Sequence, residues 1–145
     1  MTKSENNAYS TNFKELTELK SFVGKELGIT DWMQMSQQKI DDFAKITDDK
    51  QWIHTDPEKS ALYSPYKKTV AHGFLVLSMV SRISFNAFSI ENVVAGINYG
   101  LDRVRFPNAT KSDSTYRGRV SLIEFSEIPG GAKYKLKVEI EIKGE

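Results

Sequence analysis

An aspartate and a histidine lie five positions apart in the polar segment DDKQWIHTDPEK, residues 48–59. Asp49 supplies a carboxylate and His54 supplies an imidazole. Histidine titrates near neutral pH, and burial can shift the pKa of either group, so the pair could hold and polarise one water molecule. Trp52 between them indicates a partly buried turn. The alternative is that Asp48 or Asp49 caps a helical turn and that His54 is a half-exposed surface residue.

The other histidine of the chain, His72, precedes Gly73 at the start of the apolar segment VAHGFLVLSMVSRISFNAF, residues 70–88. A glycine at a helix start lets a ligand approach backbone N–H groups, which carry partial positive charge and suit a developing oxyanion. Ser78 could orient Asp49 or a substrate. The alternatives are a helix-start histidine that is hydrogen-bonded to the backbone and a serine that is bonded to its own turn.

Basic side chains could bind phosphate groups, or they could form the solvated face of a sheet or loop. They are Lys67, Lys68, Arg103, Arg105, Lys111, Arg117 and Arg119. The sequence contains no glycine-rich phosphate loop and no His-Glu-x-x-His motif. Its two histidines also do not support a Ser-His-Asp order.

The composition is typical of one soluble globular domain. The chain has 145 residues, of which 39% are hydrophobic and 27% are charged. Lys and Arg number 20 against 19 for Asp and Glu, a balance that gives no reason to expect nucleic acid or a membrane as partner. Cysteine is absent, which excludes disulfides, a thiolate nucleophile and a zinc–thiolate site. Because neither a signal peptide nor a transmembrane run is visible, a cytoplasmic protein is expected.

Spacing and capping residues predict the helices that must position the candidate site. A first helix is expected from Asn12 to Val23. Ser36 is expected to cap a second helix, and Asp56 followed by Pro57 is expected to start a third. The length and apolar character of residues 70–88 favour a buried helix over a strand.

Most of the chain after residue 90 is predicted to form strands. The segments 93–106 and 114–128 are rich in residues that favour strands, and PGG at 129–131 forms a tight turn. YKLKVEIEI, residues 134–142, alternates strictly between apolar and charged side chains, which indicates a sheet with one wet face. DWMQMS, residues 31–36, is a further short strand. Helices followed by strands predict an α+β fold.

Three segments together resemble the MaoC-like, R-specific enoyl-CoA hydratase family. DDKQWIHTDPEKS, TVAHGFLVLSMVS and INYGLDRVRFP, at 48–60, 69–81 and 97–107, occur in the family's order at compatible separations. The likeness runs from about Phe13 to the C-terminus and is strongest to the NodN-like branch of small single-domain proteins. The family's aspartate-to-histidine spacing, here in a Gln-Trp variant, matches Asp49 and His54.

The resemblance implies a hot dog fold, in which an antiparallel sheet wraps around a long central helix. It implies one such domain over residues 11–145, after a disordered leader over 1–10, and a homodimer. The chain stops at EIKGE, before the last strand that members usually have. An uncovered strand edge there would need either that strand or a partner to pair with.

The implied activity is reversible hydration of a trans-2-enoyl-CoA to the (R)-3-hydroxyacyl-CoA, with the coenzyme A thioester as substrate and no metal or other cofactor. Catalytic roles would belong to Asp49, His54, Gly73 and Ser78. Substrate contacts are expected from Trp52, His72, Phe74, Leu77, Arg103 and Arg105. The alternatives are a non-catalytic module that binds acyl-CoA or acyl-carrier protein, and an acyl-CoA thioesterase, because a fold alone does not determine function.

Overall fold

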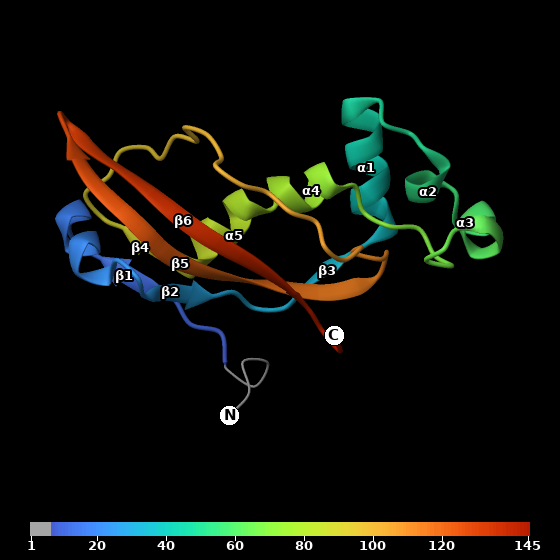
Figure 1. Ribbon diagram of the computed structural model, residues 1–145, viewed down its shortest axis with the longest axis horizontal. Coiled ribbons are helices and arrows are strands. Elements are labelled where there is room, and N and C mark those ends of the chain that lie inside the picture. Colours follow the sequence, from blue (N-terminus) through green and yellow to red (C-terminus); the bar gives the residue numbers. More distant parts are fainter. Residues whose placement is uncertain (1–6) are drawn as a thin grey trace. The chain divides into compact units, whose positions relative to one another are not determined.

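The computed structural model describes residues 7–145, which form two compact units (Figure 1). The first unit contains residues 7–31, 80–102 and 117–141, and the second contains residues 32–79, 103–116 and 142–145. The single domain expected over 11–145 stays a prediction.

The disordered leader expected over residues 1–10 falls partly outside the described residues, which begin at residue 7. Within the described part, Tyr9 pairs with Ile29 through two backbone hydrogen bonds of 3.0 and 2.9 Å. The expectation of disorder is therefore wrong at Tyr9.

An antiparallel sheet forms the base of the first unit. Strand β2, Glu26–Ile29, and strand β6, Gly131–Ile142, both pair with β5, Ser114–Ile128. The turn between β5 and β6 contains Gly130 at φ +80°, a left-handed conformation that suits glycine. The predicted strands at 114–128 and 134–142 are thus confirmed, although the apolar side chains of β6 are half-buried rather than fully buried.

Helix α5, Val80–Ala87, packs against this sheet at very short range (Figure 1). Two glycines of the sheet make this possible because they have no side chain. A Cβ atom at Gly28 would lie 2.1 Å from the carbonyl oxygen of Ala87, and one at Gly118 would lie 2.3 Å from the side chain of Ile83.

The predicted helix from Asn12 to Val23 is wrong in its first turn. Strand β1, Thr11–Phe13, pairs in parallel with β4, Phe88–Ile90, and a 3₁₀ helix, η2, covers Leu16–Phe22. Phe13 and Leu19 are both buried, so their helical spacing reflects two different elements that face the same core.

The second unit contains a group of short helices, and their predicted caps are confirmed. Helix α1, Gln37–Thr47, begins at Ser36, whose hydroxyl accepts a hydrogen bond from the Lys39 N–H at 3.2 Å. Helix α2 covers Trp52–Thr55. Helix α3, Pro57–Tyr63, begins at Asp56, whose carboxylate accepts from the Lys59 N–H at 3.0 Å. The expected short strand is β3, Met33–Met35, which pairs with residues 114–116 of β5.

The apolar segment 70–88 does not form one buried helix. It contains α4, Gly73–Ser78, and α5, with Met79 between them. Leu75 and Ile83 are buried, whereas Phe74 and Phe85 are 72% and 77% exposed, so each helix has one buried and one open face. No helix among residues 7–145 has the length and apolar character needed to cross a membrane.

The strand expected over residues 93–106 is also absent. All of this segment is described, and it contains no regular element. Its apolar side chains, including Val94, Ile97 and Tyr99, are exposed. Strand-forming composition alone does not make a strand where no neighbouring strand pairs with the segment.

Candidate active site

Asp49 lies on the connection after α1, and His54 lies on the short helix α2, both in the second unit. Helix α1 ends at Asp48, which adopts a left-handed conformation with φ 60° and turns the chain toward Asp49. Asp49 is half-buried, and its carboxylate accepts a hydrogen bond of 3.2 Å from the Gln51 side chain. His54 is 7% exposed on α2. The predicted turn therefore places the carboxylate and the imidazole in one place.

The His54 ring is held by a backbone carbonyl. Its Nδ1 lies 2.6 Å from the Val70 oxygen, so this nitrogen carries the proton and donates it. Nε2 then holds a lone pair and can accept a proton. Burial lowers the pKa of His54 below its ordinary value, and the bond to Val70 opposes this shift without cancelling it. His54 is therefore a neutral imidazole at pH 7.

Residues 69–72 form the segment that holds His54, and they are anchored on several sides. The Val70 N–H donates to the Ile53 oxygen at 3.0 Å, and the Ala71 N–H donates to the Thr110 oxygen at 2.7 Å. The Thr69 hydroxyl is hydrogen-bonded to the Gln37 side chain. Because Gln37 also donates to the His54 carbonyl oxygen at 2.8 Å, helix α1 and the 69–72 segment are tied to α2.

His72 joins the same cluster from the residue before α4. Its Nε2 lies 2.9 Å from the Asp49 backbone oxygen, to which it donates. Its ring stacks on that of His54, with a centroid separation of 3.8 Å and an interplanar angle of 23°. The Phe43 ring contacts it at 5.0 Å. His72 is 3% exposed, and its Nδ1 has no hydrogen-bond partner among the described residues.

The three side chains are the only described group with the composition of a metal site. One ligand atom each from Asp49, His54 and His72 lies within 4.8 Å of the others. Imidazole binds a metal through a lone pair in the ring plane, and a tetrahedral zinc ion needs ligand nitrogens about 3.3 Å apart. A metal in the plane of one stacked ring would lie out of the plane of the other, so this arrangement does not match a zinc site. The expected absence of a metal stays a prediction.

Gly73 begins α4 and lies under an aromatic ring. The N–H groups of Leu75 and Val76 donate to the His72 carbonyl, whereas that of Gly73 precedes them and has no partner within a helix turn. A Cβ atom at Gly73 would lie 2.9 Å from the Phe106 ring, which is half-exposed. The close approach of Phe106 therefore requires glycine at this position.

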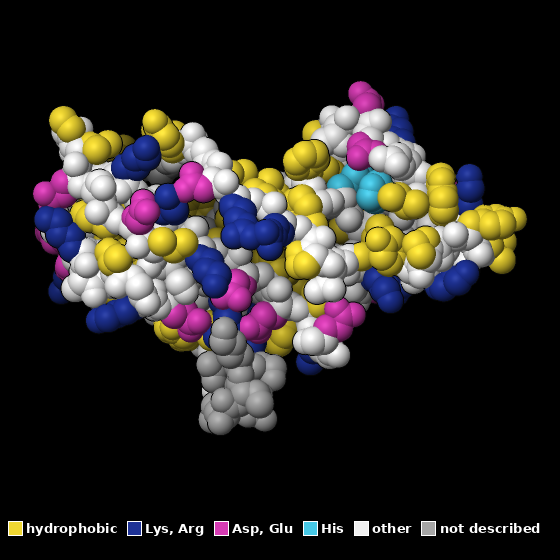
Figure 2. Space-filling view, viewed as in Figure 1, with side chains coloured by type: hydrophobic (Ala, Val, Ile, Leu, Met, Phe, Trp, Pro, Cys, Tyr) yellow, Lys and Arg dark blue, Asp and Glu magenta, His cyan; other side chains and the backbone are white. Residues whose placement is uncertain are grey.

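The other predicted site residues are less closely associated with the pair. The Ser78 hydroxyl donates to the Leu75 oxygen at 2.7 Å, so it bonds within its own turn. Phe74 is exposed, and Leu77 and Trp52 are half-buried. Lys59 lies over the Trp52 ring at 4.8 Å. Figure 2 shows histidine atoms at the surface between hydrophobic and acidic side chains.

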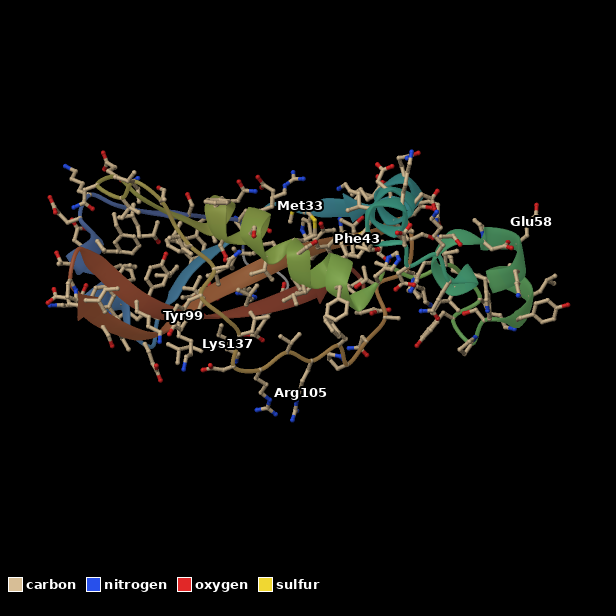
Figure 3. The ribbon with its side chains drawn as sticks, turned by 90° about the horizontal axis from the view of Figure 1, so that it is seen from above. Met33, Phe43, Glu58, Tyr99, Arg105 and Lys137 are labelled. Carbon is tan, nitrogen blue, oxygen red and sulfur yellow. The ribbon has the colours of Figure 1, made fainter. Side chains whose placement is uncertain are left out.

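The arginines separate into two groups. Arg103 and Arg105 are exposed, and Arg105 points away from the segment that carries it (Figure 3). Arg117 and Arg119 of the first unit are 2% and 3% exposed and form ion pairs with Glu141. The expectation that the latter two either bind phosphate or lie on a solvated face is wrong.

Sequence reasoning missed three residues that contact the candidate site residues His54, His72 and Gly73. Val70 acts through its carbonyl group, Phe43 through its ring and Phe106 through its contact with Gly73. Only the position of Val70, two residues before His72, gave any signal. Every residue has a backbone carbonyl group, so the residue type does not show which one will hold His54. Phe106 is 33 positions from Gly73 in the chain.

Comparison with known proteins identifies the class. The profile of the MaoC like domain matches residues 18–141. A solved monoamine oxidase regulatory protein from Archaeoglobus fulgius superimposes with a TM-score of 0.72 at 22% identity, covering 91% of this chain and 86% of that one. An unliganded R-hydratase from Pseudomonas aeruginosa gives 0.65 at 16% identity, covering 83% and 72%. The α+β chain therefore has the hot dog fold of MaoC-like proteins.

Two curated relatives support the same family. Nodulation protein N of Rhizobium leguminosarum bv. viciae is 43% identical over 131 residues, which cover 87% of this chain and 81% of the relative. A 3-hydroxyacyl-thioester dehydratase Z of Mycobacterium tuberculosis is 33% identical over 133 residues, which cover 91% and 87%. The chain belongs to the MaoC-like dehydratase domain family.

Proposed function

We propose that the chain is an (R)-specific enoyl-CoA hydratase, which adds water reversibly to a trans-2-enoyl-CoA and forms the (R)-3-hydroxyacyl-CoA. The observation that carries the proposal is the convergence of the Asp49 carboxylate with His54, whose Nε2 is left as an acceptor by the bond to Val70. The dehydratase activity named for the mycobacterial relative is the reverse of this reaction on a thioester.

The pair would hold one water molecule between two acceptors. In the hydration direction the O–H bond of that water breaks as its oxygen bonds to C3. The lone pair on Nε2 makes His54 the proposed acceptor of the proton, because the lowered pKa keeps the ring unprotonated at neutral pH, and Asp49 orients the water. The pair then returns one proton to C2, so that the substrate gains one water and the protein recovers its initial protonation state.

The thioester oxygen gains negative charge while water adds, and the Gly73 N–H is the group we propose to stabilise it. One such donor is worth about 3 kcal/mol, or roughly 100-fold in rate. Trp52 and Leu77 would contact the acyl chain, and the exposed Arg103 and Arg105 would meet the phosphates of coenzyme A. Ser78 would support α4 only through its bond to Leu75. The homodimer, the cytoplasmic location and the absence of a cofactor remain part of this proposal.

Crotonyl-CoA provides the test, because hydration removes the absorbance of its conjugated double bond. We expect turnover by the unaltered chain and a loss of about 10²–10⁴-fold in kcat for Asp49→Asn and for His54→Ala. Asp42→Asn is the matched control, since Asp42 is an exposed aspartate of α1 that is bonded to Gln38. Equal turnover in all three variants would exclude the proposed pair.

A binding module and a thioesterase are the alternatives. A saturated acyl-CoA cannot be hydrated, so release of free coenzyme A from it would indicate a thioesterase. Binding of the thioester without either reaction would indicate a module that only holds acyl groups. The combination of a carboxylate with a buried, neutral imidazole favours the hydratase over both.

A further inference from the structure

We propose that His72 is a positioning residue that holds both members of the Asp49–His54 pair, by donating a hydrogen bond to the Asp49 backbone and by stacking on the His54 ring. The inference rests on the proposed function for its kinetic consequence only. It replaces the expectation that His72 contacts substrate.

The hydrogen bond fixes the connection that carries the carboxylate. Asp49 follows a left-handed residue at the end of α1, where the chain leaves the helix. The 2.9 Å bond from His72 Nε2 to the Asp49 oxygen joins this connection to the residue before α4, 23 positions away. A carboxylate that must orient one water needs such an anchor, because small displacements reduce catalysis strongly.

The stack fixes the plane of the other member. His54 is held by Nδ1 to Val70, and one hydrogen bond leaves the ring able to tilt about that bond. The His72 ring, 3.8 Å away and nearly parallel, restricts this tilt from one face. His72 is itself buried and contacts Phe43, so it is a rigid support.

The two bonds also assign the protons of both rings. His54 carries its proton on Nδ1, and His72 carries its proton on Nε2. The titratable groups that act on His54 are Asp49, which raises its pKa, and His72, which lowers it.

Nuclear magnetic resonance can test this assignment directly, because the chain has only two histidines. A nitrogen–proton correlation spectrum of the whole chain should show one Nδ1–H ring and one Nε2–H ring. His72→Gln leaves one ring, so the remaining signal belongs to His54 and should be that of an Nδ1–H ring. An Nδ1–H proton on His72, or exchange between its two tautomers, would overturn the proposal.

Two substitutions separate the bond from the stack in kinetics with crotonyl-CoA. His72→Phe keeps a ring but removes the donor, and we expect kcat to fall about 10–100-fold with KM changed less than twofold. His72→Gln keeps an N–H at the level of Nε2 but has no ring, so it should recover part of this loss, and the part that remains measures the stack. A raised KM at unchanged kcat would show instead that His72 binds substrate.

Further measurements separate a loss of folding, and a failure of the proposed function, from a loss of positioning by His72. Thermal unfolding shows whether each variant is folded, and Lys45→Gln, at an exposed position of α1, is the control. If the unaltered chain does not hydrate crotonyl-CoA, the proposed function fails, whereas the tautomers of the two rings still decide the role of His72.

Discussion

At the scale of single residues, the chemistry of His54 depends on a carbonyl group. The Val70 carbonyl oxygen accepts a hydrogen bond from Nδ1–H, and this leaves Nε2 as the ring nitrogen with a free lone pair. Burial then lowers the pKa of the ring, because a charged imidazolium is poorly solvated there. Position and protonation state are thus set together by the fold around residues 69–72.

The pH dependence of activity follows from this arrangement. If neutral His54 accepts the water proton, activity should persist below about pH 6.5, the ordinary histidine pKa, and should fall only as the pH drops through the lowered pKa of His54. The measurement is kcat/KM for crotonyl-CoA between pH 4.5 and 8. Activity that rises as the pH falls from 7 to 6 would show that the imidazolium is the active form instead.

Gly73 provides a second test at a single position. An alanine Cβ there would lie 2.9 Å from the Phe106 ring, so either the ring or the start of α4 must move. We expect Gly73→Ala to lower the free energy of unfolding by about 1–3 kcal/mol and to reduce kcat through the displaced N–H group. Both are measurable by urea unfolding and by crotonyl-CoA turnover.

Measuring Gly73→Ala in a Phe106→Ala background tests whether contact with the Phe106 ring causes the loss of stability. With the ring removed, Gly73→Ala should cost much less stability, and the difference between the two backgrounds gives the coupling energy of the pair. An equal loss of unfolding free energy in both backgrounds would mean that the contact with Phe106 is not the reason that glycine is needed at position 73.

The pair itself could be predicted from the sequence, but its supports could not. The spacing of Asp49 and His54 on a short polar connection is local information. The ring of His72 meets His54 only because residues 69–72 pair with Ile53 and Thr110. Contacts that depend on the folded path leave no pattern in neighbouring residues.

At the scale of elements, the predictions that held rest on local chemistry. Ser36 and Asp56 cap helices because a side-chain oxygen satisfies an N–H of the first turn, a rule that needs only adjacent residues. Residues 93–106 have the composition of a strand but lack a paired neighbour. Strand formation depends on distant segments, so composition was not sufficient there.

The packing of α5 on the sheet gives a prediction at this scale. Gly28→Ala would place a Cβ 2.1 Å from the Ala87 carbonyl oxygen, and a backbone atom cannot rotate away as a side chain can. We expect a loss of about 3 kcal/mol or more in the free energy of unfolding, measured with urea. Gly96→Ala is the matched control, because nothing lies within 4 Å of its Cβ position, and it should change stability by less than about 0.5 kcal/mol. Similar losses in both variants would contradict the close approach.

At the scale of the whole molecule, a network of charges joins distant parts of the first unit. Arg117 and Arg119 of β5 pair with Glu141 of β6, and Arg119 also pairs with Glu26 of β2 at 3.1 Å. Both guanidinium groups are nearly fully buried. In the sequence these arginines lie in a strand of mixed polarity, and their partners are up to 93 positions away. Their burial could therefore not be predicted from the strand alone.

The carboxylate of Glu141 is the shared member of this network, and its titration should be visible in the stability of the protein. Burial raises the pKa of Glu141, but hydrogen bonds and charge from Arg119 and Arg117 outweigh burial and hold the pKa below its ordinary value. The folded state therefore binds a proton at Glu141 less readily than the unfolded state does. Its contribution to stability is present above about pH 4.3, the ordinary glutamate pKa, and is lost as the pH falls through the lowered value.

Glu141→Gln removes that charge while keeping the shape of the side chain. We expect a loss of roughly 1–3 kcal/mol in the free energy of unfolding at pH 7, less than for a fully buried pair because the Glu141 side chain is 23% exposed. Urea unfolding at pH 7, 5 and 3 should show an unchanged difference from the unaltered chain down to pH 5 and a smaller one at pH 3. Glu139→Gln, on the same strand and in an exposed pair with Lys137, should cost less than about 0.5 kcal/mol. A difference for Glu141→Gln that stayed constant to pH 3 would show that the loss does not come from a carboxylate whose pKa is lowered in the folded state.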